Sequence, residues 1–261
     1  MSQTSTAAAA ADNQARRPKL VVTLGRGSKG KSVLLRYVAE TSARSRPLRI
    51  VDADPSNDSL SRFFPGEAVS PESLDEEDRR VWLEKEFWDM IERRYDMLLD
   101  VGGGDLLVKR LGAEVGLAQA LEAEGIDLIA IHMLGPDLDD LHYLEDVETK
   151  GLLQPKHTVL MLNAGLVPPT SRPSAAFATV LESPIVKRVR ADDTNGRQVT
   201  LVVMPCLPCM RDIEAAGLPN FASALTPEGR KMIGPFNVVR VRRWLNQEMA
   251  ELRNSLGDLL P

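Results

Sequence analysis

Ten residues near the start of the sequence, TLGRGSKGKS at positions 23–32, constrain the fold more strongly than any other stretch. They fit the pattern G-x-x-x-x-G-K-[ST], whose glycines let backbone N–H groups curl around phosphate oxygens. A β-branched run, KLVVTL, precedes the pattern, and a segment with apolar residues at helical spacing follows it. This order predicts a buried strand, a phosphate-binding loop and the N-terminus of a helix, whose dipole favours anions. The residues expected around the phosphates are Gly25, Arg26, Gly27, Ser28, Lys29, Gly30, Lys31, Ser32 and Val33.

Two side chains of this loop carry its expected chemistry. In a loop of this pattern the lysine at position 31 reaches the β and γ phosphates, and the hydroxyl of Ser32 ligates Mg²⁺. Arg26 and Lys29 are two further cations that a phosphate cradle does not need. The pattern alone does not explain them.

Apolar, strand-sized runs alternate with helical patterns along the rest of the chain. The predicted strands cover 19–25, 47–56, 95–105, 125–134, 157–165 and 199–205. Strands that alternate with helices of this length predict an α/β fold, a mostly parallel β-sheet flanked by helices on both faces. No linker divides the chain, so we expect a flexible N-terminal tail over 1–18 and a single domain over 19–261.

Two helices are predicted in more detail. The first lies within 70–94, with Ser70 as a candidate cap, and its expected core positions are Val81, Trp82, Phe87, Met90 and Ile91. The second covers 237–256 and is amphipathic, basic at its start and acidic further on. We expect this closing helix to pack on the domain rather than to bind a membrane.

Composition excludes several classes of protein. The net charge of −5 argues against a protein that coats nucleic acid with its whole surface. The longest apolar runs are strand-sized, residues 1–18 lack the apolar core of a signal peptide, and two cysteines make no disulfide scaffold. We therefore expect a cytoplasmic protein.

Acidic residues end two of the predicted strands. Asp100 closes YDMLLD, where a carboxylate that holds Mg²⁺ through water is expected, and Asp52 and Asp54 close the strand that follows the phosphate loop's helix. Carboxyl ends of parallel strands line the ligand crevice, so these side chains can face the phosphates. The alternative is that each aspartate caps the turn after its strand.

These motifs together resemble the ParA/MinD superfamily of P-loop ATPases, which have a Rossmann-like fold. The resemblance rests on the G-x-G-x-x-G-K-[ST] loop, the D-x-D-P strand end, the strand that ends at Asp100 and a late proline-led segment. In that segment the matching residues are Pro205, Arg211, Ala215, Gly217 and Pro219. The short distance from Asp54 to Asp100, with DADPSN and MLNAG, looks most like the plasmid conjugal-transfer (TraL-type) and partition branch.

The resemblance implies an activity. Members of this superfamily bind ATP and Mg²⁺, form a homodimer across two nucleotides, and hydrolyse ATP slowly under the control of a partner protein or DNA. By position, Lys31 and Ser32 would serve the phosphates and magnesium, and Asp100 would hold the metal. Asp54 would orient the attacking water and Asp52 would support the magnesium shell. Asn163 and Pro205 would form the walls around the base, or Asn163 would simply cap the end of its strand.

The loop departs from the family pattern at two positions. Arg26 replaces the lysine that reaches the partner subunit's phosphates in the family, and Ser28 replaces a glycine. A guanidinium can bind two phosphate oxygens at once, so Arg26 could keep that catalytic role in trans, or it could be a surface residue. Lys29 could be solvated or form a salt bridge across the dimer. Two rival functions remain, a nucleotide-gated scaffold with vestigial hydrolysis and an ATP-dependent small-molecule ligase or kinase.

Weaker features are interpreted conservatively. The C-x-x-C of Cys206 and Cys209 could bind zinc only if a homodimer supplied two pairs, so we interpret it as structural. His132 lies inside an apolar strand, where a core residue with satisfied hydrogen bonds is expected. The candidates for a non-specific DNA patch are Lys187, Arg188, Arg190, Arg240, Arg242 and Arg243.

Overall fold

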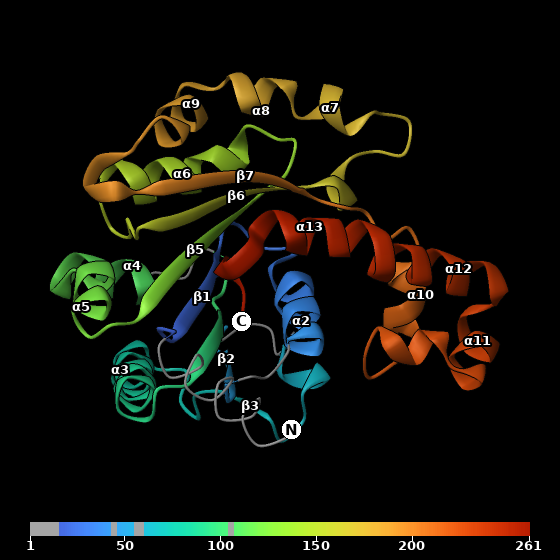
Figure 1. Ribbon diagram of the computed structural model, residues 1–261, viewed down its shortest axis with the longest axis horizontal. Coiled ribbons are helices and arrows are strands. Elements are labelled where there is room, and N and C mark those ends of the chain that lie inside the picture. The colour runs from blue at the N-terminus through green and yellow to red at the C-terminus, as the bar shows by residue number, and fades with distance from the viewer. Residues whose placement is uncertain (1–15, 43–45, 55–59, 104–106) are drawn as a thin grey trace, which may run out of the picture.

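The fold is built on one parallel sheet, seen in the computed structural model, which describes residues 16–42, 46–54, 60–103 and 107–261 (Figure 1). Seven strands lie in the order β3-β2-β4-β1-β5-β6-β7, and each neighbouring pair is parallel. The strands are β1 (Lys19–Leu24), β2 (Leu48–Asp52), β3 (Ala68–Val69), β4 (Asp96–Asp100), β5 (Asp127–Leu134), β6 (His157–Asn163) and β7 (Gln198–Met204). The predicted fold class is confirmed.

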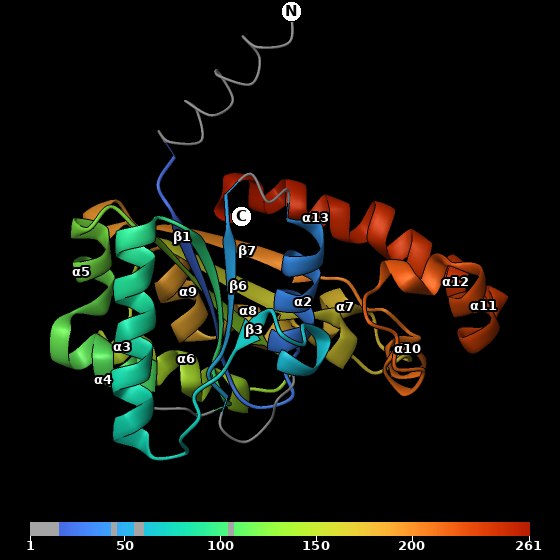
Figure 2. The same ribbon diagram turned by 90° about the horizontal axis from the view of Figure 1, so that it is seen from below.

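Helices connect successive strands and cover both faces. The longer ones are α2 (Lys31–Thr41), α3 (Glu76–Arg93), α4 (Leu107–Val115), α6 (Asp139–Thr149), α12 (Pro235–Arg243) and α13 (Met249–Leu256). The shorter ones are α5 (Leu117–Ala123), α7 (Pro173–Ala176), α8 (Ala178–Glu182), α9 (Pro184–Arg190), α10 (Met210–Ala215) and α11 (Pro227–Ile233). Figure 2 shows α10 to α12 projecting beyond the sheet at one side.

The core divides into two layers because side chains alternate along each strand. On β1, Val21 packs in the layer that contains α2 and the helices α10 to α13. Its neighbours Leu20 and Val22 point to the opposite layer, which contains α3, α4 and α5. The central strands β4, β1, β5 and β6 are buried on both faces, which is why they appear in the sequence as apolar runs.

The helix predicted within 70–94 begins later than its cap candidate. Asp75, not Ser70, is the N-cap, and its side chain accepts hydrogen bonds from two backbone N–H groups of the first turn. Ser70 instead shares a 2.8 Å hydrogen bond with the Ser61 hydroxyl. The buried residues of this helix, among them Leu83, Phe87 and Met90, recur every three or four positions, and Val81 lies off this face and is 54% exposed. The predicted core role of Val81 is therefore wrong.

The other core positions predicted for this helix divide into two groups. Phe87 and Met90 are buried in the layer that contains α3 to α5. Trp82 and Ile91 are partly buried and pack against the same layer.

The closing helix packs on the domain, as expected. It consists of α12, a π-helical turn over Trp244–Glu248, and α13. A π turn inserts one residue and rotates the buried stripe. Trp244 is buried at this turn and packs edge-on against Tyr37 and Phe221.

The described residues of the expected tail contact the domain. Arg16 donates a 3.1 Å hydrogen bond to the carbonyl of Leu260, and Arg17 donates one of 2.8 Å to that of Glu122. Residues 1–15, the rest of that tail, lie outside the described residues. Within the described part of the chain, no helix combines the length and apolarity needed to cross a membrane.

Candidate functional site

The loop between β1 and α2 has the backbone that its glycines predict. Gly25 has φ 132° and Gly30 has φ 90°, and Gly30 is the N-cap of α2. A Cβ at Gly25 would lie 2.8 Å from the carbonyl oxygen of Met133, and one at Gly30 would lie 2.4 Å from Asn163 Nδ2. Both ends of the loop therefore require glycine. Ser28 has φ 60°, the left-handed region that glycine enters more easily than serine does.

Lys31 points back into the loop. Its Nζ donates hydrogen bonds to the carbonyls of Gly25 (3.3 Å) and Arg26 (3.2 Å), and the residue is 6% exposed. Burial lowers the pKa of this ammonium, while the nearby charges of Asp100 and Asp54 act in the opposite direction. The ammonium is thus held by two long hydrogen bonds to uncharged backbone carbonyls. The carboxylates of Asp100 and Asp54 lie near enough to act on its charge.

Asp100 lies directly behind the loop. Ser32 Oγ donates a 2.5 Å hydrogen bond to Asp100 Oδ2, and Thr23 Oγ1 donates a 3.4 Å bond to Oδ1. The sheet register explains the geometry, because both Thr23 on β1 and Asp52 on β2 pair with Asp100 on β4. Three strand ends and the first turn of α2 therefore meet at one point.

Negative charge is concentrated here. Burial, together with the charges of Asp52 and Asp54, raises the pKa of Asp100 to about 6. The hydrogen bond from Ser32 and the charge of Lys31 lower it without cancelling the effect of burial. A cation at this place would compensate the buried carboxylate.

Asp52 serves the turn that follows its strand. Its Oδ2 accepts hydrogen bonds from the backbone N–H groups of Leu60 (3.1 Å) and Ser61 (2.8 Å), and its Oδ1 accepts one from Asp54 (3.4 Å). The turn-capping alternative for Asp52 is therefore present in the structure. Asp54 is half-buried and close enough to Lys31 and Asp100 to influence their charges. Pro55, the last residue of the D-x-D-P motif, lies outside the described residues.

The donor set suits magnesium bound together with phosphates. Ser32 and Asp100 supply hard oxygen ligands, which Mg²⁺ prefers. In the described ranges, no three His, Cys, Asp or Glu side chains form a cage that could hold a metal alone. Mg²⁺ in nucleotide sites uses one or two protein ligands and completes its shell with phosphate oxygens and water, so the residues present fit it.

The two surplus cations are bound by the first turn of α6. Lys29 Nζ lies 2.9 Å from Asp140 Oδ1, and the two side chains are 15% and 1% exposed. Arg26 Nη1 lies 3.6 Å from Asp139 Oδ2 and 3.9 Å from Asp140 Oδ1, and its side chain is 51% exposed. Lys29 therefore forms a salt bridge within the chain, which the sequence did not predict.

Asn163 joins the end of β6 to the loop. Its Nδ2 donates a 2.8 Å hydrogen bond to the carbonyl of Lys29, and its Oδ1 accepts one of 2.9 Å from the backbone N–H of Gly165. The strand-end cap considered for Asn163 is thus present, and its contact with a base stays a prediction. Pro205 lies at the end of β7, where its carbonyl accepts a 3.0 Å hydrogen bond from Trp244 Nε1.

Sequence reasoning missed two residues that contact the loop. Asp140 could have been suspected only from the acidic pair that opens α6. Gly103 follows β4, and a Cβ there would lie 2.1 Å from the backbone nitrogen of Gly27. The glycine-rich run after Asp100 was the available signal for this close approach.

The other candidate features stay apart from the loop. The Cys206 side chain is exposed and that of Cys209 is buried, and desolvation by the surrounding protein raises the pKa of both thiols. The basic residues considered as one DNA patch are divided between α9 and α12, which lie at opposite ends of the molecule (Figures 1 and 2). On α9, Lys187 is paired with Glu182 at 2.6 Å. These six cations do not form a single patch.

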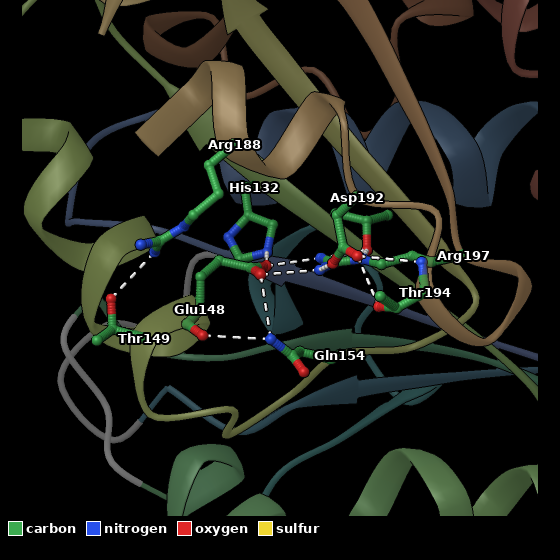
Figure 3. Close-up of polar contacts among 9 residues, drawn as sticks. His132, Glu148, Thr149, Gln154, Arg188, Asp192, Thr194 and Arg197 are labelled. Atoms are coloured by element: carbon green, nitrogen blue, oxygen red, sulfur yellow. Dashed lines mark hydrogen bonds and ion pairs between the residues drawn. The ribbon is translucent and has the colours of Figure 1, made fainter. Parts of the chain in front are cut away.

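His132 is buried as predicted, but its ring nitrogens lack the expected hydrogen bonds to the described residues. It is 1% exposed, and neither ring nitrogen has a hydrogen-bond partner among the described residues. Figure 3 shows it beside Glu148, which forms a double hydrogen bond with Arg197 at 2.8 and 2.6 Å. The nearest His132–Glu148 distance is 4.0 Å, so the expectation of satisfied hydrogen bonds was wrong.

Two cavities lie away from the loop. One, of about 420 Å³, is lined by residues at the amino ends of β5, β6 and β7, including Arg17, Lys156 and Arg197. All three cations are ion-paired, with Asp127, Glu122 and Glu148. The other, of about 640 Å³, lies beside β7 and α13 and is mostly apolar.

Comparison with known proteins gives likeness of fold. No protein-family model matches the chain, and no curated protein matches it. It is similar to the septum site-determining protein MinD complexed with Mg-ADP from Pyrococcus horikoshii OT3, with TM-score 0.48 and 16% identity, covering 90% of this chain and 98% of that one. A plasmid partition protein from Borrelia burgdorferi gives TM-score 0.42 and 12% identity over 72% and 90% of the two chains. Chloroplast FtsY from Physcomitrella patens gives TM-score 0.42 and 13% identity. That match covers 72% of this chain but only 58% of FtsY.

Proposed function

We propose that this chain is a Mg²⁺-dependent ATPase of the ParA/MinD type that acts in plasmid or DNA partition or in conjugal transfer. The observation that carries the proposal is the 2.5 Å contact of Ser32 with Asp100 behind a loop with the expected glycine geometry. A loop that merely turned the chain would not require a buried carboxylate at its base. Burial of a carboxylate is costly unless a cation or hydrogen bonds compensate its charge.

Each residue of the site would have a separate role in binding and hydrolysing the nucleotide. When bound, Mg²⁺ neutralises charge on the transferred phosphoryl group. Ser32 and Asp100 are placed to hold it, with Asp52 behind them. Lys31 would exchange its two long bonds to loop carbonyls for bonds to phosphate oxygens, which are stronger because both partners are charged. Asp54 would orient the attacking water.

The dimer and the partners are further parts of the proposal. The Arg26 side chain is 51% exposed and its ion pairs are long, so it is free enough to reach phosphates across a homodimer interface. Asn163 and Pro205 would border the base. A protein that stimulates hydrolysis would set the rate, and DNA would bind the basic part of α12. A cytoplasmic location follows from such a role.

Nucleotide titration and phosphate release test the proposal. Wild-type protein, Lys31→Ala, Asp54→Ala and the exposed control Lys85→Ala would be titrated with fluorescent ATP, ADP and GTP analogues, with Mg²⁺ and with EDTA. We expect Lys31→Ala to lose affinity, Asp54→Ala to bind ATP without releasing phosphate, and Lys85→Ala to behave as wild type. Wild-type protein that binds no nucleotide would refute the proposal.

The rival functions give different results in the same assays. Binding of ATP with no release of phosphate, with any partner protein or DNA added, favours a nucleotide-gated scaffold. Turnover that requires an added small molecule favours a ligase or kinase. Sedimentation with an ATP analogue tests the dimer, and Arg26→Ala should weaken the dimer without weakening nucleotide binding by the monomer.

A further inference from the structure

Residue 29 of the phosphate loop is held at two points. Its backbone carbonyl accepts the 2.8 Å hydrogen bond from Asn163, at the end of β6. Its side-chain ammonium lies 2.9 Å from Asp140, in the first turn of α6. Both partners belong to the half of the sheet beyond β1, so residue 29 links the loop to β6 and to the β5–α6 connection.

Lys29 is the main counter-charge for the buried carboxylate of Asp140. The carboxylate is 1% exposed, and its Oδ2 accepts a 2.9 Å hydrogen bond from the backbone N–H of Gly135. Its Oδ1 is buried and accepts no hydrogen bond from the described residues. The Lys29 ammonium at 2.9 Å is therefore the main compensation for the charge on this oxygen, because the Arg26 guanidinium is at 3.9 Å. A buried carboxylate that loses its counter-charge is strongly destabilised, so this pair resists opening.

The neighbouring pair is much weaker. Arg26 and Asp139 are 51% and 70% exposed, and their charged atoms are 3.6 Å apart. An ion pair between exposed side chains contributes little to stability, because water screens it. The first turn of α6 thus fixes one cation of the loop and leaves the other free to move.

We propose that Asp140 is a positioning residue for nucleotide binding, which acts through Lys29. The Lys29–Asp140 pair, defined here as the loop strut, holds residues 25–30 open so that their N–H groups can surround phosphates. The inference rests on the proposed nucleotide site, and it adds a residue that touches neither phosphate nor metal. Gly135 belongs to the same device, because a Cβ there would lie 2.4 Å from Asp140 Oδ2 and 3.3 Å from Lys29 Nζ.

The direction in which one substitution changes the nucleotide affinity distinguishes the strut from simple electrostatics. Asp140→Asn removes a negative charge near the phosphates, so electrostatics alone predicts tighter nucleotide binding. The strut predicts weaker binding, by about tenfold, because Lys29 and the loop are no longer fixed. Asp137→Asn is the matched control, since it removes one negative charge from the exposed connection just before α6.

The experiment measures dissociation constants of a fluorescent ATP analogue with Mg²⁺. We expect Asp140→Asn and Lys29→Met each to weaken binding about tenfold, and the double variant to be no weaker than either single variant, because both disrupt one pair. Lys29→Arg keeps the charge and should restore part of the affinity. Asp137→Asn should bind as wild type or slightly more tightly. Melting temperatures would be measured alongside, to show that each variant is folded.

Hydrogen exchange without nucleotide gives a second readout. If the strut fixes the loop, the backbone amides of residues 25–31 should exchange faster in Asp140→Asn than in wild type. Their exchange rates in Asp137→Asn should equal those of wild type. Nucleotide affinity in Asp140→Asn equal to or tighter than wild type, or additive losses in the double variant, would overturn the inference while leaving the nucleotide site intact. A wild-type chain that binds no nucleotide would instead remove the proposed function and the inference together.

Discussion

Ser32 and Asp100 are 68 residues apart in sequence, yet the serine hydroxyl donates a 2.5 Å hydrogen bond to the carboxylate. The contact exists because β1 and β4 are neighbours in a parallel sheet and both end at the same edge. It places a buried negative charge directly beneath the loop that would hold phosphates.

Asp100→Asn is expected to abolish the magnesium dependence of nucleotide binding. The amide can still accept the bond from Ser32, but it carries no charge to attract Mg²⁺. The affinity ratio with and without Mg²⁺ should fall by at least about tenfold, measured by titration in Mg²⁺ and in EDTA. Asp96→Asn is the matched control, because Asp96 lies at the other end of the same strand. An unchanged magnesium dependence in Asp100→Asn would contradict the assignment.

The parts of the fold that local signals encode could be predicted from the sequence. Buried strands and the glycine pattern around Gly25 and Gly30 are local, so the parallel sheet and the loop were predicted correctly. β3 has only two residues, Ala68 and Val69, and gives no pattern. Ser70 and Asp75 are both good cap residues, and the sequence could not decide between them.

The site was harder to predict where it depends on pairing between distant segments. Asp140 meets Lys29 only because α6 starts beside the loop, and no spacing rule connects the two positions. His132 was correctly placed in the core, but its missing hydrogen-bond partners depend on how α6 and β7 pack around it. Charge compensation is a property of the folded neighbourhood, and periodicity does not contain it.

Asp96 should make the protein less stable as pH rises. Burial raises the pKa of this carboxyl to about 6, and the charges of Arg46 and Arg16 oppose the shift. Between pH 4 and 6 the folded state therefore holds a proton that the unfolded state releases, so the free energy of unfolding falls as pH rises through this window. The effect is at most about 3 kcal/mol. Asp96→Asn, which can still accept the bond from the Lys19 N–H, should reduce this slope in urea unfolding at several pH values and leave the part that Asp100 contributes in the same window.

His132 should act with the opposite sign. Burial lowers the pKa of its imidazole to about 4, Glu148 raises it, and Arg197 lowers it. The unfolded state takes up a proton as pH falls below about 6.5, while the folded state does not until about 4. The contribution to stability is complete above pH 6.5 and is lost as pH falls towards 4, by about 3 kcal/mol at most. His132→Leu should flatten this acid limb. A limb as steep as in wild type would show that other groups cause it.

The Arg197–Glu148 pair gives the last prediction, and it concerns the far end of α6. Arg197 binds Glu148 through two hydrogen bonds and also binds Asp192 at 2.8 Å, and both members of the pair are less than 5% exposed (Figure 3). Helix α6 is therefore fixed at its start by Asp140 and at its end by Glu148.

Arg197→Met leaves the Glu148 charge buried without its partner, which should cost about 3 to 5 kcal/mol in the free energy of unfolding. Arg197→Met combined with Glu148→Leu leaves neither of these two charges, so it should be more stable than the single variant. Urea denaturation of wild type, Arg197→Met, Glu148→Leu and the double variant measures the coupling energy between the two side chains. A double variant whose loss equals the sum of the single losses would show that the buried pair contributes no coupling energy. Because a frayed α6 would also loosen its first turn, Arg197→Met should weaken nucleotide binding less than Asp140→Asn does, and the double variant should recover part of that loss.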